Sequence, residues 1–181
     1  MLIVALRECF ASKREFAKLA IPLIIEKLSS SVEEAQLDSL ETFAKCARTV
    51  YDPNDFKEHI EQLWSLFQQV AMNATKASLE YAALDAIRAM ANSLSRSVQS
   101  FDSTVKTATI KVSIDSFVEK ALDSCASYLN EPDLKLVWPN VKCLQAVASG
   151  SSTSNLLILK NILPLLLKHY NSTSIVSLTF I

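Results

Sequence analysis

Apolar residues recur through most of this chain at intervals of three and four positions, the spacing of helices that bury one face. Polar turns separate these runs: serines at 29–31, YDPND at 51–55 and NATKAS at 73–78. We expect Asn54 or Asp55 to cap the helix that follows the second turn. The pattern therefore predicts antiparallel helical hairpins joined by short connections.

The hairpins repeat along the sequence. AQLDSLETFA at 35–44 aligns without gaps on AALDAIRAMA at 82–91, so Asp38 and Asp85 stand 47 residues apart. A third unit has helices at about 113–129 and 141–148, and the second of these aligns with the first unit at an offset of 104. A period of about 40–47 residues with two helices per unit is typical of HEAT and armadillo arrays.

We therefore predict an all-α fold: a right-handed α-solenoid of antiparallel helix pairs, HEAT- or armadillo-like, with about three and a half repeats in a single domain. Neither end is polar, and SIVSLTFI at 174–181 resembles the opening of a helix. We expect an internal piece of a longer array or a truncated product. The Ser/Thr-rich stretch 95–113 is expected to be an exposed loop. The expected divisions are the end of a preceding repeat at 1–11, repeats at 13–50, 54–96 and 110–149, and a partial repeat at 156–181.

Prolines interrupt three of the apolar runs. Pro22 and Pro164 lack a capping residue before them, and the apolar spacing continues past both. We expect each to lie inside a kinked helix instead of starting a new one. Pro139 is expected to kink or restart its segment, whereas Pro132 suits a helix start.

Composition excludes several classes of protein. Half of the residues are hydrophobic, and 19 acidic residues nearly balance 18 basic ones, which gives no footprint for direct nucleic-acid binding. The one glycine, Gly150, disfavours strand-and-turn and dinucleotide-binding folds. No signal peptide or membrane span is expected. Four widely spaced cysteines at apolar-periodic positions are expected to be reduced core residues: Cys9, Cys46, Cys125 and Cys143.

No catalytic, metal-binding or phosphate-binding motif is present, and His59 and His169 belong to different repeats. We therefore expect no enzyme activity, cofactor, metal or small-molecule substrate. A helical enzyme domain would need a pocket that joins one of these histidines to carboxylates. The aromatic residues Trp64, Phe67 and Tyr81 are interpreted as core and not as a stacking platform.

One polar stripe repeats with the helices. The offsets of 47 and 104 carry Asp38, Glu41 and Lys45 onto other polar residues of later units. In HEAT-like stacks the second helices line the concave face, so the stripe forms a mixed-charge ladder. The ladder is either a solvated face with ion pairs between repeats or part of a groove that binds partner proteins. Its further members are Asp85, Arg88 and Asn92 and, less securely, Lys142, Gln145 and Ser149.

The N-terminal half resembles one family. LRECF, then FAKLAIPLIIEKL, then A-x-LDSL with a following cysteine and tyrosine, resemble the methyl-methanesulfonate-sensitivity nineteen family across residues 6–51, and LEYAALDAIRAM at 79–90 is compatible. Beyond about residue 95 the resemblance is a general helical pattern.

The resemblance implies a HEAT-repeat scaffold of cytosolic iron–sulfur protein assembly, linked to nucleotide excision repair and transcription. Its expected partners are assembly factors and apo iron–sulfur enzymes of DNA metabolism, in cytoplasm and nucleus. The alternative is another HEAT-type adaptor, such as a transport receptor.

Overall fold

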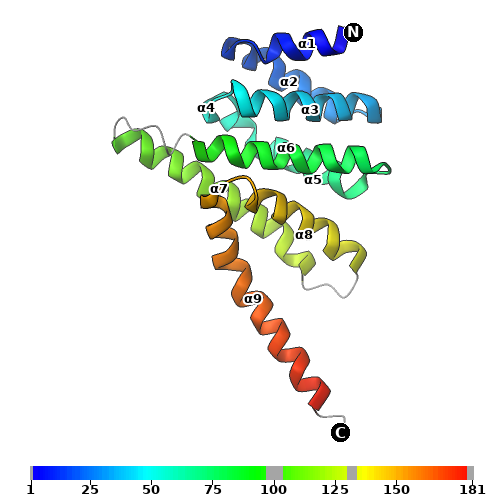
Figure 1. The fold of residues 1–181 in the computed structure, drawn as a ribbon, viewed down its shortest axis with the longest axis vertical. Coiled ribbons are helices and arrows are strands. Elements are labelled where there is room, and N and C mark those ends of the chain that lie inside the picture. Colours follow the sequence, from blue (N-terminus) through cyan, green and yellow to red (C-terminus); the bar gives the residue numbers. More distant parts are fainter. Residues whose placement is uncertain (1, 97–103, 130–133, 179–181) are drawn as a thin grey trace.

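The computed structural model describes residues 2–96, 104–129 and 134–178, which contain helices and no strand (Figure 1). The prediction of an all-α chain is confirmed over these residues. Two 3-10 turns, at Arg14–Phe16 and Lys57–His59, precede α2 and α5. The helices are α1 (Leu2–Phe10), α2 (Ala17–Leu28), α3 (Glu33–Thr49), α4 (Pro53–Phe56), α5 (Ile60–Asn73), α6 (Ala77–Arg96), α7 (Thr104–Leu129), α8 (Leu134–Ala148) and α9 (Ser152–Leu178).

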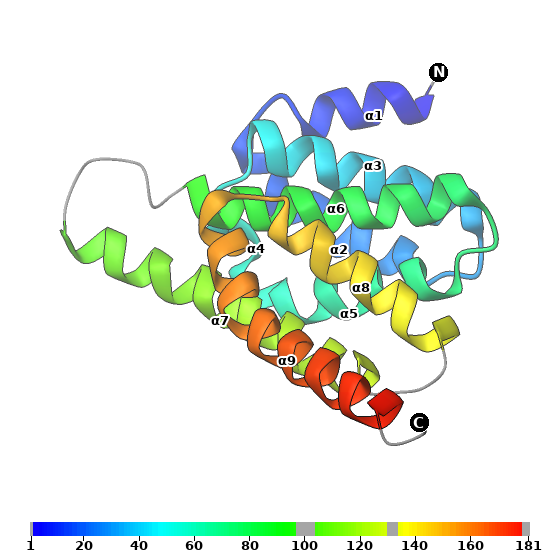
Figure 2. The same cartoon turned by 60° about the horizontal axis from the view of Figure 1, so that its bottom comes forward.

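Helices α1, α3, α6 and α8 form one row in which each helix contacts the next (Figure 1). Each of α3, α6 and α8 also packs on the helix that precedes it in its hairpin: α2, α5 and α7. Helix α9 contacts α7 and α8, and it extends away from the row toward the C-terminal end of the molecule. In Figure 2, α7 and α9 run side by side. The division into HEAT repeats, and the hand of their stacking, stay predictions.

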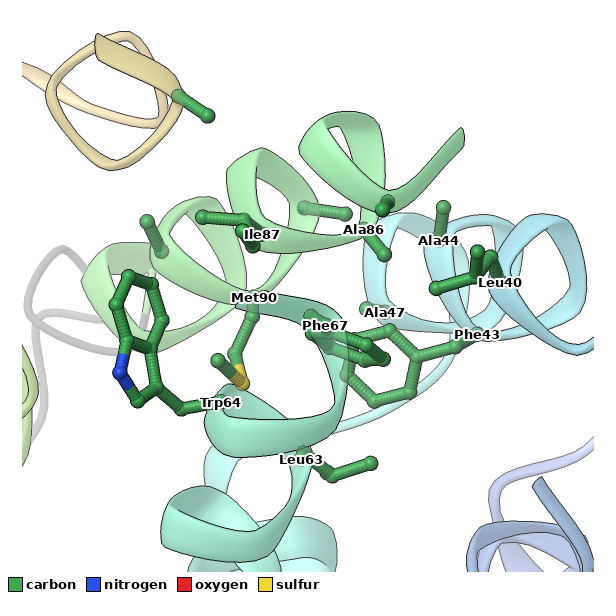
Figure 3. Packing of buried hydrophobic residues seen from close by; sticks show 14 of the residues in the cluster. Leu40, Phe43, Ala44, Ala47, Leu63, Trp64, Phe67, Ala86, Ile87 and Met90 are labelled. Carbon is green, nitrogen blue, oxygen red and sulfur yellow. The ribbon is translucent and has the colours of Figure 1, made fainter. Parts of the chain in front are cut away.

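The core runs from α2 to α9, and Figure 3 shows the part of it between α3, α5 and α6. Phe43 of α3 is fully buried, with its ring centroid 5.9 Å from Phe56 and 5.0 Å from Phe67. Trp64 extends the same core toward α7, where its ring meets Phe117 edge-on at 5.7 Å. Alanines on the facing sides of α3 and α6 let the two helix backbones approach closely, so the larger aromatic rings fill the space beneath them.

The prolines lie inside helices, as expected. Pro22 is in α2, Pro139 in α8 and Pro164 in α9, and each helix is continuous across its proline. A proline removes one backbone hydrogen bond but leaves the flanking turns intact when tertiary packing supports them. Pro139 therefore does not restart its segment, while Pro132 lies outside the described residues.

Three local predictions were wrong. Asp52, not Asn54 or Asp55, caps α4. Its carboxylate accepts a hydrogen bond from the Asn54 amide, and the Asp55 carboxylate accepts one from the Asp52 amide, which completes a capping box. Helix α7 begins at Thr104, so much of the expected loop at 95–113 is helical, and 97–103 lie outside the described residues. The residues 174–178 continue α9 instead of opening a helix.

The cysteines divide into two groups. Cys46, Cys125 and Cys143 are buried as expected, and burial raises the pKa of Cys125 to about 11 and that of Cys143 to about 12. Cys9 is exposed, so its assignment to the core was wrong. Among the described residues, α1 packs mainly on α3, which leaves one side of α1 uncovered. All four thiols are free.

Candidate partner-binding face

The predicted ladder lies on the row formed by α1, α3, α6 and α8. Its members on α3 bond across to α1. Arg7 Nη2 lies 2.6 Å from Asp38 and 2.7 Å from Glu41, and Lys45 donates to Glu8. Burial opposes the charge of Arg7, but its hydrogen bond to Asp38 and the nearby charge of Glu41 raise its pKa. All three α3 residues thus form ion pairs between helices.

The contact between α3 and α6 centres on Asp85. Its carboxylate accepts from Arg48 of α3 and from Arg88 of α6, the latter at 3.1 Å. Arg96, about three turns beyond Asp85 on α6, donates to the carbonyl oxygens of Ala47 and Arg48 at the carboxyl end of α3. A guanidinium at this position satisfies carbonyl groups that a helix end leaves open and complements its partial negative charge.

The contact between α6 and α8 uses the remaining ladder residues. Lys142 Nζ lies 2.6 Å from Glu80, and Arg88 Nε donates to Ser149 Oγ at 3.0 Å. Asn92 donates to the Gly150 carbonyl, also at 3.0 Å. Gln145 is exposed on the same side of α8 as Lys142. These bonds join α6 and α8 in parallel register, so the ladder residues that share an offset lie on neighbouring helices.

Two aromatic residues of this face are exposed. Tyr81 of α6 is 67% exposed and Trp138 of α8 is 60% exposed, so the assignment of Tyr81 to the core was wrong. Trp64 and Phe67 are buried, as expected. The signal was available: the offsets of 47 and 104 carry Glu34 onto Tyr81 and Trp138, one turn before the first ladder rung.

A hollow of about 350 Å³ opens at the other end of the face, where α3, α6 and the α8–α9 turn meet. We call it the arginine hollow. A hollow of about 510 Å³ lies between α2, α3, α5 and α6, and one of about 390 Å³ lies between α1, α2 and α3. The second of these is lined by apolar and polar side chains in equal number. The arginine hollow is lined by Arg48, Arg88, Ala89, Asn92, Ser149 and Gly150.

The described side chains form no cluster of histidine, cysteine and carboxylate groups with the geometry of a metal site. His59 is half-buried in the 3-10 turn before α5, and the side chain of His169 lies outside the described ones. None of the described helices combines the length and the apolar composition that a bilayer crossing requires. The face presents ion pairs, hydrogen-bond donors and two exposed aromatic rings.

Comparison with known proteins shows which family this chain resembles. A family model described as "Dos2-interacting transcription regulator of RNA-Pol-II" matches residues 1–73. The MMS19 nucleotide excision repair protein homolog of Xenopus tropicalis is 42% identical over 170 residues, 94% of this chain and 16% of that relative. The homolog of Homo sapiens is 36% identical over 173 residues, 96% of this chain and again 16% of that relative.

A more distant relative aligns over a shorter stretch. The DNA repair/transcription protein mms19 of Schizosaccharomyces pombe is 27% identical over 89 residues, 49% of this chain. The vertebrate alignments run well past residue 95, so the likeness extends further than the motifs of the first half indicated. This chain spans 16% of the length of these vertebrate relatives, and it belongs to the MMS19 family.

Proposed function

We propose that this chain works as a non-enzymatic, protein-binding adaptor in DNA repair and transcription. The observation that carries the proposal is the 42% identity, over 94% of the chain, to a protein named for nucleotide excision repair. The match of residues 1–73 to a transcription-regulator family points the same way. A role in these processes places the protein in the nucleus. The iron–sulfur role that the family resemblance implies would place it in the cytoplasm as well.

We further propose that the helices form a right-handed HEAT-type solenoid with the repeat divisions given above. The continuous row of α1, α3, α6 and α8 and the in-register bonds between α6 and α8 support this arrangement. In such an array the ladder residues occupy equivalent positions of successive units. We propose that the ladder contributes to a protein-binding groove in addition to joining the helices.

The resemblance to the family suggests a specific role, the delivery of iron–sulfur clusters to enzymes of DNA replication and repair. The cluster is cargo of the assembly machinery in this proposal. Burial of three of the four cysteines, none of them in a disulfide, agrees with a role in targeting.

Affinity purification of the whole protein from cells, followed by mass spectrometry, tests the proposal. We expect recovery of iron–sulfur assembly factors and iron–sulfur helicases above the level found with an unrelated helical-repeat bait. Recovery of nuclear transport cargo without any iron–sulfur enzyme would instead support the transport-receptor alternative. Recovery of neither class would contradict the adaptor role.

A further inference from the structure

The arginine hollow carries more positive charge than the structure neutralises. Two guanidinium groups, Arg48 and Arg88, share the single carboxylate of Asp85, which leaves two positive charges against one negative. In the described parts of the chain, Asp85 is the one carboxylate paired with either arginine, and the lining of the hollow contains no acid. The nearest ladder acids, Asp38 and Glu41, are held by Arg7.

The hollow also presents donors in a form suited to oxygen ligands. Each guanidinium has five N–H groups in a planar fork that matches a carboxylate. Arg88 uses Nε for Ser149 and Nη1 for Asp85, while Arg48 contacts Asp85 through Nη2. The bond to Ser149 fixes the orientation of Arg88, so less conformational entropy is lost when a ligand binds. Arg48 and Arg88 remain 43% and 39% exposed, and a partner can reach them.

The exposed aromatic pair lies at a defined spacing from this charge. Tyr81 precedes Arg88 on the same side of α6 by seven residues, or about 10 Å of helix. Helix α8 contacts α6 and runs parallel to it, and its Trp138 lies one turn before Lys142, which pairs with Glu80 next to Tyr81. Exposed tyrosine and tryptophan are the residues that most often anchor protein interfaces. The face thus has an apolar end and a cationic end.

We propose that this face binds an extended acidic segment of a partner protein, whose carboxylates enter the arginine hollow while an apolar side chain rests on Tyr81 and Trp138. The inference deepens the proposed adaptor role and rests on it. In an extended chain, three residues span about 10 Å, so the apolar residue precedes the acidic ones by about three positions. Glu8, Asp38 and Glu41 lie along the same row and disfavour a long polyanion such as DNA.

Fluorescence anisotropy tests the inference with a labelled ten-residue peptide that has a phenylalanine three positions before three consecutive glutamates. Matched peptides replace the glutamates by glutamine or the phenylalanine by alanine. The whole chain is expected to bind the acidic peptide and to bind the glutamine peptide at least about tenfold more weakly. Equal binding of the two peptides would overturn the proposal. So would stronger competition by single-stranded DNA than by unlabelled acidic peptide.

Variants assign the binding to the hollow. Arg88→Gln is expected to weaken the acidic peptide by about tenfold. Asp85→Asn frees both guanidinium groups, so it is expected to tighten binding by about threefold. A purely structural role for Asp85 would weaken binding instead. Arg14→Gln is the matched control, because Arg14 forms ion pairs with Asp52 and Asp55 away from this face, and it should leave the affinity unchanged.

The apolar end has its own test. Tyr81→Ser is expected to lower the affinity for the phenylalanine peptide by about fivefold and to leave the affinity for the alanine peptide unchanged. An equal loss for both peptides would refute the assignment of the apolar side chain to Tyr81. Circular dichroism of each variant serves as the control for folding. The two experiments test the two proposals separately. Absence of peptide binding would overturn this inference and leave the adaptor proposal standing. Absence of iron–sulfur clients in the affinity purification would contradict the adaptor proposal without changing the peptide titration.

Discussion

Helices α6 and α9 are both long, but they contribute differently to the fold. Helix α6 packs on α3, α5, α7 and α8, and eleven of its residues are buried. In α9 the described side chains, residues 152–167, include only Ser154 and Ile158 as buried ones. The exposed apolar side chains of α9 are Leu156, Leu159, Leu163, Leu166 and Leu167.

The difference shows that apolar composition does not decide which helix stabilises the fold. The small alanine side chains of α6 allow neighbouring helices to pack closely on several sides of it. Larger side chains such as Met90 and Phe67 fill the interior between these helices. Leucines on α9 have more apolar surface but fewer neighbours, so they contribute less. We therefore expect substitutions in the α3–α5–α6 core to act strongly and those on α9 to act weakly.

The largest expected effect separates these two regions. Phe43→Ala removes a fully buried ring that meets Phe56 and Phe67, and it is expected to lower the free energy of unfolding by about 3–5 kcal/mol. Leu163→Ala on α9, where the side chain is 51% exposed, should change it by about 0.5 kcal/mol or less. Urea denaturation followed by circular dichroism measures both. Similar losses for the two variants would refute the contrast.

A second effect concerns the close approach of α6 to the α8–α9 turn. A Cβ at Gly150 would lie 2.6 Å from Ala91 Cβ and 2.9 Å from the Arg88 carbonyl oxygen. Gly150→Ala is therefore expected to cost about 1–3 kcal/mol. The double variant with Ala91→Gly should lose less than the sum of the two single losses, because one of the two clashes is removed. Simple additivity of the losses would show that the contact is not the cause.

Alkali is expected to weaken the packed region. Burial holds the pKa of Cys125 at about 11 and of Cys143 at about 12, above the ordinary thiol value of 9.0. Burial raises the pKa of Tyr51 as well. The folded state therefore keeps protons that the unfolded state releases. The contribution of the protonated thiols to the free energy of unfolding is complete below about pH 9. It is lost progressively as pH rises toward 11, by up to about 1.4 kcal/mol per pH unit for each thiol.

Urea midpoints measured from pH 8 to pH 10.5 check this expectation. Cys125→Ala lowers the midpoint at every pH through lost packing, so only the slope with pH is compared. The slope should be shallower in the variant than in the unchanged chain. Parallel slopes would show that the Cys125 thiol does not report on folding.

The smallest expected effect concerns the ladder. Lys142→Gln removes the ion pair with Glu80 between α6 and α8, and both partners are partly exposed. We expect a loss of about 0.2–1 kcal/mol that shrinks further in high salt. Lys160→Gln on the exposed surface of α9 should have no measurable effect. A loss above about 2 kcal/mol for Lys142→Gln would mean that the ladder is a main source of stability and not chiefly a recognition surface.

Much of the fold was predictable from spacing alone. The hairpins at α2–α3 and α5–α6 follow the apolar period. The lack of a capping residue before Pro22 and Pro164 predicted that both prolines lie inside helices, as they do. The start of α7 was not predictable in this way. Residues 104–113 carry three threonines and one serine, whose helix propensity is modest, and they are helical as an extension of the apolar run that follows.

The candidate face was predictable in its polar part and not in its aromatic part. In α6, alanine occupies positions on every side, so apolar spacing does not identify which side is buried. Tyr81 fits one such spacing and was assigned to the wrong side. Cys9 fits an apolar spacing as well, but α1 has too few neighbours in the described structure to bury it. Burial depends on neighbouring helices that a local pattern does not contain.

Hydrogen–deuterium exchange of the whole chain, with and without the phenylalanine–glutamate peptide, tests most directly whether recognition belongs to the packed row and not to α9. We predict slower exchange in peptides that cover residues 77–96 and 137–150, and no change across 152–167. Protection confined to 152–167, with none on α6 or α8, would contradict the account.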